Sequence, residues 1–211
     1  MLFNLFRTSV GKKIIMSATG LCFCGFIAIH LFGNLMIYGG KSLFNAYVKA
    51  LHSLGALITV FEFILLALAL LHVTAGAVIF VQNLRARPRR YFKNKSSGGR
   101  TPGSATMPYT GLIMALFIIF HLMDFHFAPR EGTTVFDIAA QVFSRAGYVI
   151  AYVIAVIAAA LHISHGFWSA FQTLGAHHPR YMPAIKGIGI LFSLAVGIGF
   201  GLIPIFMSFS A

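Results

Sequence analysis

Four histidines lie inside long apolar stretches of this chain, an unfavourable place for an ionisable side chain. They are His30, His72, His121 and His162, and each falls in a different stretch. A bilayer core takes about 20 apolar residues as a helix. An ionisable side chain at its centre costs ~2.5 kcal/mol or more on insertion scales. Histidines in this setting therefore predict a functional site within the membrane.

The stretches that carry these histidines have the length and composition of membrane spans. Of the 211 residues, 58% are hydrophobic and 9% are charged, whereas soluble domains carry about 25% charged residues. No internal repeat is apparent. We expect a loop at 39–53 and a short interfacial helix between the third and fourth spans. The expected fold is an all-α integral membrane protein, one domain over 1–211, with five transmembrane helices at about 14–38, 54–84, 109–128, 146–174 and 185–206.

Basic residues predict how the bundle is oriented in the membrane. Lys and Arg concentrate in the N-terminal lead, in a basic loop at 85–108 and in the loop before the fifth span. Because such loops stay on the cytoplasmic side, we expect a cytoplasmic N-terminus and an outside C-terminus. The formal net charge of +12 is therefore explained by topology. No basic soluble domain is present to bind nucleic acid.

Depth along the helices sorts the four histidines into two layers. At 1.5 Å per residue, His30 and His121 lie about 13 and 11 Å below the outer loops. His72 and His162 lie about 28 and 25 Å below the same side. Two b-type haems stacked across the bilayer need this arrangement, because each iron takes one imidazole from either face of the porphyrin. We predict axial pairs of His30 with His121 and His72 with His162, and His165 remains an alternative to His162.

Small residues near the histidines favour a flat cofactor. A macrocycle that lies against a helix needs room on the face of its ligand, and residues at i+3 and i+4 share that face. Gly33, Gly76 and Gly166 occupy such positions after three of the four histidines, so we assign them to haem packing. Less favoured interpretations are hydrogen-bonded packing histidines and a zinc site, whose ligands would have to converge on one point.

The chain resembles a known family over nearly its whole length. The most specific matches are His-Leu-x-x-Asn in the first span, Thr-Met-x-x-Thr-Gly before the third and His-x-x-His-Gly-x-Trp in the fourth. They resemble the di-haem cytochrome b membrane subunit of succinate:quinone oxidoreductases, of the five-helix, single-anchor type found in menaquinone-using bacteria. The resemblance implies an outer (distal) haem held by His30 and His121 and an inner (proximal) haem held by His72 and His162. The matching stretches are residues 17–35, 62–76, 106–127 and 161–175.

The resemblance also implies a subunit rather than a complete enzyme. It would anchor a succinate dehydrogenase or fumarate reductase in the bacterial cytoplasmic (inner) membrane. A flavoprotein subunit would interconvert succinate and fumarate, an iron–sulfur subunit would pass electrons to the inner haem, and a quinone, by implication menaquinone, would react near the outer haem. This chain has no Rossmann glycine motif and no cysteine cluster, so the partners would supply FAD and the iron–sulfur clusters. The basic loop would suit docking of these partners, and a higher oligomer of the complex stays open.

One carboxylate, Glu62, is expected to be buried inside a span. It precedes His72 by ten residues and therefore lies about 15 Å further out, near the depth of the outer haem. We hypothesise that Glu62 accepts or delivers a quinone proton. A glutamic acid buried in its protonated form at a helix contact is the other interpretation. The second carboxylate that some family members carry before the fourth-span ligand is Ala160 here.

Two alternative functions remain open. One is a di-haem cytochrome b of another quinone-linked complex, such as a hydrogenase, formate dehydrogenase or nitrate reductase. The other is a haem-free, proton-coupled transporter that uses its histidines as a relay, a class in which broken helices or inverted repeats are typical.

Overall fold

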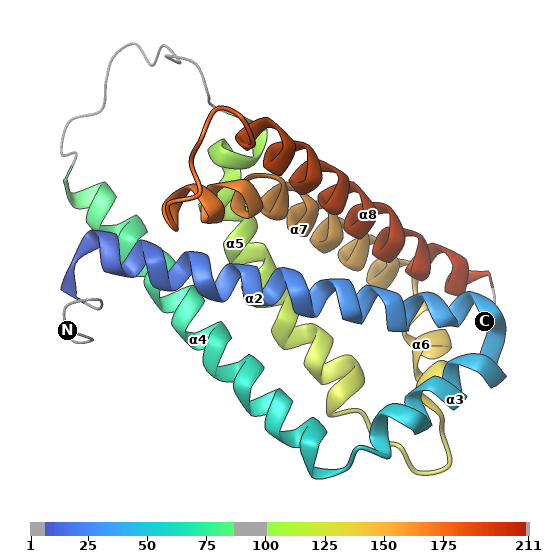
Figure 1. The fold of residues 1–211 in the computed structure, drawn as a ribbon. Coiled ribbons are helices and arrows are strands. Elements are labelled where there is room, and N and C mark those ends of the chain that lie inside the picture. Colours follow the sequence, from blue (N-terminus) through green and yellow to red (C-terminus); the bar gives the residue numbers. More distant parts are fainter. Residues whose placement is uncertain (1–6, 87–100, 210–211) are drawn as a thin grey trace.

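The computed structural model describes residues 7–86 and 101–209, and these residues form a bundle of helices (Figure 1). Five helical stretches are long and apolar enough to cross a membrane, which confirms the expected number of spans. The elements are α2 (Ser9–Leu35), the 3-10 segment η1 (Met36–Gly39), α3 (Gly40–His52), α4 (Ala56–Arg85), α5 (Pro102–His121), the π-helical turn η2 (Leu122–His126), α6 (Val135–Phe143), α7 (Ala146–Thr173) and α8 (Met182–Ser208).

The third spanning helix begins earlier than expected, at Pro102 rather than near residue 109. The Ser104 amide donates a hydrogen bond to the Thr101 hydroxyl, and the Thr101 amide donates one to the Ser104 hydroxyl. Together these two bonds form a capping box. Proline at the first helical position adds to this start signal. Of the predicted basic loop, residues 87–100 lie outside the described residues.

The segment expected to be a loop at 39–53 is the helix α3 instead. With 13 residues it is too short to span a membrane by itself, yet its apolar residues Phe44, Tyr47 and Val48 share one helix face. Phe44 is buried and Tyr47 and Val48 are half-buried, so packing of this face stabilises the helix. The expected short interfacial helix before the fourth span is α6.

Helix α7 lies at the centre of the packing. It contacts α8 and α5 along much of its length and also packs against α2, which in turn contacts α4 and α8 (Figure 1). Helix α4 contacts α2 and, more weakly, α5. Large apolar side chains such as Phe63, Leu66 and Leu70 are exposed on α4, as expected of a surface that faces lipid.

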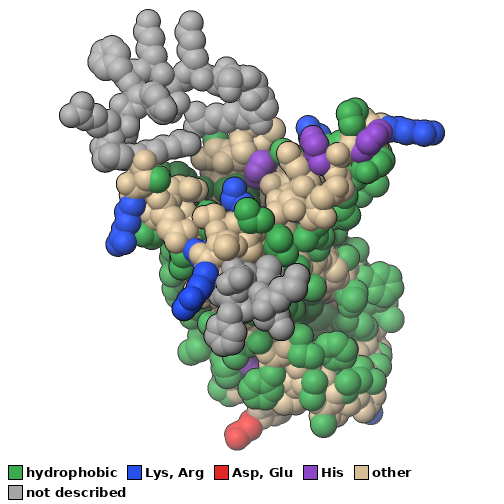
Figure 2. Space-filling model, turned by 60° about the vertical axis from the view of Figure 1, so that its left-hand side comes forward, with side chains coloured by type: hydrophobic (Ala, Val, Ile, Leu, Met, Phe, Trp, Pro, Cys, Tyr) green, Lys and Arg blue, Asp and Glu red, His purple; other side chains and the backbone are tan. Residues whose placement is uncertain are grey.

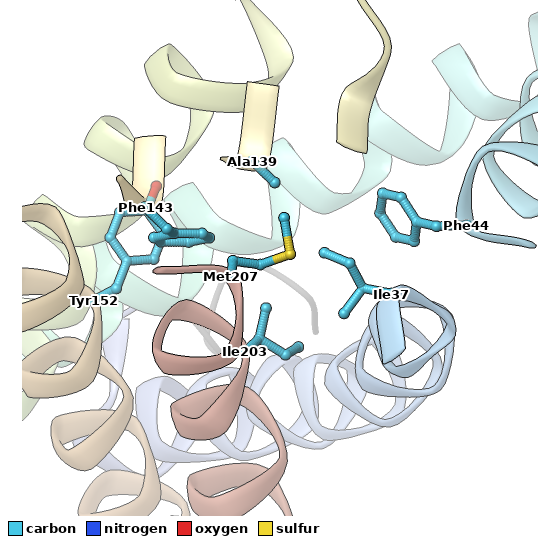
Figure 3. Packing of buried hydrophobic residues seen from close by; sticks show 7 residues of the cluster. All are labelled: Ile37, Phe44, Ala139, Phe143, Tyr152, Ile203 and Met207. Carbon is cyan, nitrogen blue, oxygen red and sulfur yellow. The ribbon is translucent and has the colours of Figure 1, made fainter. Parts of the chain in front are cut away.

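A core of buried apolar side chains closes one end of the bundle (Figure 3). Here η1 and α3 meet α6, α7 and α8. Met207 is completely buried and Ile37 is 2% exposed, so the core holds the short helices against the ends of the long ones. Its members are Ile37, Phe44, Ala139, Phe143, Tyr152, Ile203 and Met207.

Charge is distributed unequally between the two ends of the bundle. Figure 2 shows Lys and Arg side chains gathered at one end, while hydrophobic side chains cover the sides. We call this the basic end; it contains the starts of α2, α5 and α8 and the ends of α4 and α7. All four acidic residues of the chain belong to the opposite half: Glu62, Asp124, Glu131 and Asp137. This asymmetry is consistent with a cytoplasmic basic end, and the orientation stays a prediction.

One ion pair joins α3 to α6 at the opposite end, where Lys41 Nζ lies 2.7 Å from Asp137 Oδ1. Hydrogen bonds from Lys41 and Thr134 hold the pKa of the Asp137 carboxyl below its ordinary value. Because the folded-state pKa is lowered, the contribution of the pair to stability is complete above about pH 4, the unfolded-state value. It is lost as the pH falls through the folded-state pKa.

We therefore expect Asp137→Asn to lower the unfolding temperature of the detergent-solubilised protein at pH 6, and the difference from wild type to shrink toward pH 3. Thermal unfolding of both proteins across this range measures it. Lys49→Ala, which removes an exposed cation from α3, the helix of Lys41, is the control. A difference that does not change with pH would contradict the assignment.

Candidate functional site

The four span histidines form two pairs, one in each half of the bundle. His30 of α2 and His121 of α5 lie toward the opposite end, and their ring centroids are 6.0 Å apart. His72 of α4 and His162 of α7 lie nearer the basic end, with centroids 6.4 Å apart. We call these the outer and the inner pair. Each pair joins helices that are distant in the sequence, in the combination that depth along the helices predicts.

Both pairs have the spacing of two imidazoles that share one metal ion. Such rings have centroids about 6 Å apart when they bind from opposite sides, because each metal–nitrogen bond is about 2 Å long and each ring centre lies about 1 Å behind its nitrogen. Among the described residues, no group of three or more His, Cys, Asp or Glu side chains is gathered for a metal ion. An axial haem site needs only two protein ligands, so the residues present fit this cofactor.

The inner pair is held by hydrogen bonds to threonine hydroxyls. Thr19 Oγ1 lies 3.0 Å from His72 Nδ1, and Thr110 Oγ1 lies 3.1 Å from His162 Nδ1. Both threonines are buried, with 5% and 4% of their surface exposed. The residue after each is a glycine that leaves room for the imidazole. A Cβ at Gly20 would lie 3.2 Å from His72 Cε1.

The outer pair has a more aromatic environment. The His30 ring stacks on Phe26 with centroids 5.2 Å apart, and the His121 ring contacts Phe117, Phe125 and Tyr152. His121 Nδ1 is buried and has no hydrogen-bond partner among the described residues. A buried, unpaired imidazole nitrogen is costly. His165 Nδ1 is buried and unpaired as well, so this feature alone does not select the ligands.

Gly33 does not provide the open face that its spacing predicts. A Cβ at this position would overlap the ring and hydroxyl of Tyr47, which α3 brings back onto α2. Gly33 therefore makes room for Tyr47 rather than for a macrocycle. At Gly76 and Gly166 a Cβ would meet only Met16 Sδ at 3.7 Å and Met107 Cε at 3.9 Å.

His165, the alternative inner ligand, has different neighbours. Its ring lies edge-on to Trp168 with centroids 4.8 Å apart, and Lys186 Nζ lies 4.8 Å from the Trp168 ring centre. His162, in contrast, is the α7 histidine that faces His72. The geometry therefore favours His162 as the partner of His72.

Glu62 is less buried than its place in a span predicts. Its side chain is 46% exposed, and Oε1 lies 3.5 Å from His126 Nδ1. Glu62 lies on an outward face of α4, because this helix packs mainly against α2 and only weakly against α5. The π-helical turn η2 carries His126 toward α4, a backbone irregularity that occurs often at functional sites.

A second carboxylate, Asp124, lies nearer the outer pair. The Tyr152 hydroxyl donates to Asp124 Oδ2 over 2.7 Å, and the Tyr152 ring contacts His121. Asp124 also borders a cavity of about 240 Å³ that is lined by Gln141 and Arg145. Asp124 was not among the site residues predicted from the sequence. The signal that could have identified it is its position one turn after His121, inside a predicted span.

Comparison with known proteins finds a similar subunit of a succinate dehydrogenase. The chain is similar to the succinate dehydrogenase cytochrome b558 subunit of Bacillus subtilis (strain 168). The two are 26% identical over 152 residues, which cover 71% of this chain and 72% of the Bacillus protein. No family model matches the chain, and no solved structure matches it. The Bacillus subunit is a cytochrome b by name, and this likeness supports a membrane-anchor cytochrome b.

An internal repeat, contrary to our expectation from the sequence, underlies the two pairs. The pattern Met-x2-Thr-Gly-Leu-x4-Phe-Ile-x2-His-Leu occurs at residues 16–31 of α2 and again at 107–122 of α5 and η2. Leu-His-(Val/Ile)-(Thr/Ser)-x-Gly occurs at 71–76 of α4 and again at 161–166 of α7. Each repeat thus contributes one outer histidine, one Thr-Gly step and one inner histidine. The repeats run in the same direction, unlike the inverted repeats weighed for a transporter.

Proposed function

We propose that this chain is the membrane-anchor cytochrome b subunit of a succinate:quinone oxidoreductase, either a succinate dehydrogenase or a quinol:fumarate reductase. The observation that carries the proposal is the pairing of four span histidines into two layers with ring centroids 6.0 and 6.4 Å apart. The likeness to the Bacillus subtilis subunit supports the choice of complex.

The histidines would hold two b haems, which supply one-electron redox chemistry at two depths of the membrane. His30 and His121 would ligate the outer haem, and His72 and His162 the inner haem. Phe26 and Phe117, which contact the outer imidazoles, restrict their rotation. Neutral imidazole suits this role, because a ligating nitrogen must keep its lone pair.

The basic end is the proposed docking side for the flavoprotein and iron–sulfur subunits. Its described cations include Lys12, Arg85 and Lys186, and all acidic residues lie in the opposite half. A surface of one sign favours association with a partner of the other sign. The quinone, by implication menaquinone, would then react at the opposite end, beside the outer pair. We place the complex in a bacterial cytoplasmic membrane.

We propose Glu62 as a proton-transfer group for the quinone, supported by its contact with His126 at 3.5 Å. Glu62→Gln keeps the shape but cannot carry a proton. We expect it to lower succinate-driven quinone reduction by roughly 100-fold, the lower end of the range for general acid–base groups. The rate is measured from pH 5 to 9, with the haem spectrum as a check on folding. Glu131→Gln, an exposed carboxylate at the same end, is the matched control. Full turnover with an unchanged pH profile would remove Glu62 from the mechanism.

Affinity purification of the tagged chain from its native membranes tests the choice of complex. We expect a flavin-containing subunit and an iron–sulfur subunit to copurify, and succinate to reduce the haem of the purified assembly. Reduction by hydrogen or formate but not by succinate would instead assign the chain to another quinone-linked complex.

A further inference from the structure

The contacts of the inner pair determine which imidazole nitrogen carries the proton. A threonine hydroxyl has one hydrogen to donate. Thr19 Oγ1 lies 2.8 Å from the Ile15 carbonyl, and Thr110 Oγ1 lies 3.1 Å from the Thr106 carbonyl. If each hydrogen goes to the carbonyl of its own helix, the hydroxyl oxygen is left as an acceptor.

The neighbouring imidazole must then be the donor. His72 Nδ1 faces two acceptors, Thr19 Oγ1 at 3.0 Å and the Met16 carbonyl at 3.0 Å, which a protonated Nδ1 satisfies and an unprotonated one does not. His162 Nδ1 faces Thr110 Oγ1 at 3.1 Å. The Met16 carbonyl can only accept, so it places the proton of His72 on Nδ1, and His162 has the same form when Thr110 donates to its own helix. The lone pair then lies on Nε2 and is free for a metal ion.

The outer pair lacks this arrangement. His30 Nδ1 has the Asn34 amide nitrogen, a donor, at 3.4 Å, and His121 Nδ1 has no partner within the described ranges. The two pairs therefore differ in the hydrogen bond behind the ligand, although the repeat makes their helices similar. Both threonines occupy the same place in the repeat, followed by Gly20 and Gly111.

We infer that Thr19 and Thr110 are matched positioning residues that hold His72 and His162 in the Nδ1–H form and thereby lower the reduction potential of the inner haem. The inference rests on the proposed two-haem function. A hydrogen bond from the distant ring nitrogen raises the basicity of the ligating nitrogen, which favours ferric over ferrous iron. Among the residues that the structure describes, no hydroxyl contacts Nδ1 of either outer histidine.

Redox titration of the purified complex, followed by the visible spectrum, tests this role. Thr19→Val and Thr110→Val keep the shape and remove the hydroxyl acceptor, which leaves His72 Nδ1 with the Met16 carbonyl alone. At a fixed potential we expect each to raise the ferrous-to-ferric ratio of the inner haem about threefold, a shift of about 28 mV for one electron. The outer haem should be unchanged. Thr19→Ser and Thr110→Ser restore the hydroxyl and should behave as wild type. Thr173→Val is the matched control, because that hydroxyl bonds the Ser169 carbonyl of its own helix.

The outcomes separate this inference from the proposed function. A wild-type chain without two haems contradicts the proposed function itself. With two haems present, an unshifted inner potential or an equal shift of both haems overturns the role of the threonines. Loss of the inner haem in the valine variants supports the role when the serine variants retain it, and overturns it when they lose it too.

Discussion

Alanine at either His72 or His162 is expected to remove one and the same haem, while alanine at either His30 or His121 removes the other. Each substitution deletes one of the two proposed axial ligands of a haem, and the ring centroids of a pair lie 6.4 or 6.0 Å apart. Haem content should fall from two to about one per chain in every single variant. A reduced-minus-oxidised spectrum shows which haem is left.

The double variants make the test stricter. His72→Ala with His162→Ala should keep the outer haem, whereas His72→Ala with His121→Ala should lose both. His165→Ala is the matched control, since its ring contacts Trp168, and it should retain both haems. If His72→Ala and His121→Ala removed the same haem, the pairing would be wrong.

Valine at Gly20 or Gly111 is expected to abolish binding of the inner haem almost completely. A Cβ alone would lie 3.2 Å from His72 Cε1 at Gly20 and 3.4 Å from His162 Cε1 at Gly111. The two further methyl groups of valine would have to occupy space that the imidazole fills. A displaced ring cannot reach the position of an axial ligand, because axial ligation needs both nitrogens in place.

The measurement is again haem per chain, with helix content by circular dichroism to show that the bundle still forms. Gly187→Val is the matched control, as a Cβ at that glycine of α8 would meet nothing within 4 Å. We expect the control to bind two haems. Normal inner-haem content in both Gly20→Val and Gly111→Val would contradict the close approach of glycine and imidazole.

The sequence was sufficient to predict the elements that carry the site. Spanning length and apolar composition depend on single stretches of chain, so five spans were predictable. The depth of a histidine depends only on residue count along a helix. For this reason the grouping of His30 with His121 and of His72 with His162 matches the geometry, while their role as haem ligands stays a prediction.

Rotation of each helix about its axis could not be predicted in the same way. Which neighbour a residue meets depends on tertiary packing, and spacing alone placed Gly33 on a haem face that Tyr47 fills. Glu62 was expected to be buried and is 46% exposed. Asp124 was overlooked because the contact that singles it out, the hydrogen bond from Tyr152 of α7, depends on tertiary packing.

The threonines of the inner pair show a different limit. Thr19 and Thr110 lie on helices other than those of the histidines they contact, so no local pattern connects them. The signal that could have found them is the repeat itself, in which Thr-Gly precedes each outer histidine at the same distance. Aligning the histidine-bearing spans with one another singles out both threonines from their sequence positions alone.

The haem content of the purified chain, with its reduced-minus-oxidised visible spectrum, tests the central claim most directly. Two low-spin b haems per polypeptide are predicted, one for each histidine pair. A chain that folds in the membrane and carries no haem would contradict the account. It would leave the paired histidines to be explained as the proton relay of a transporter.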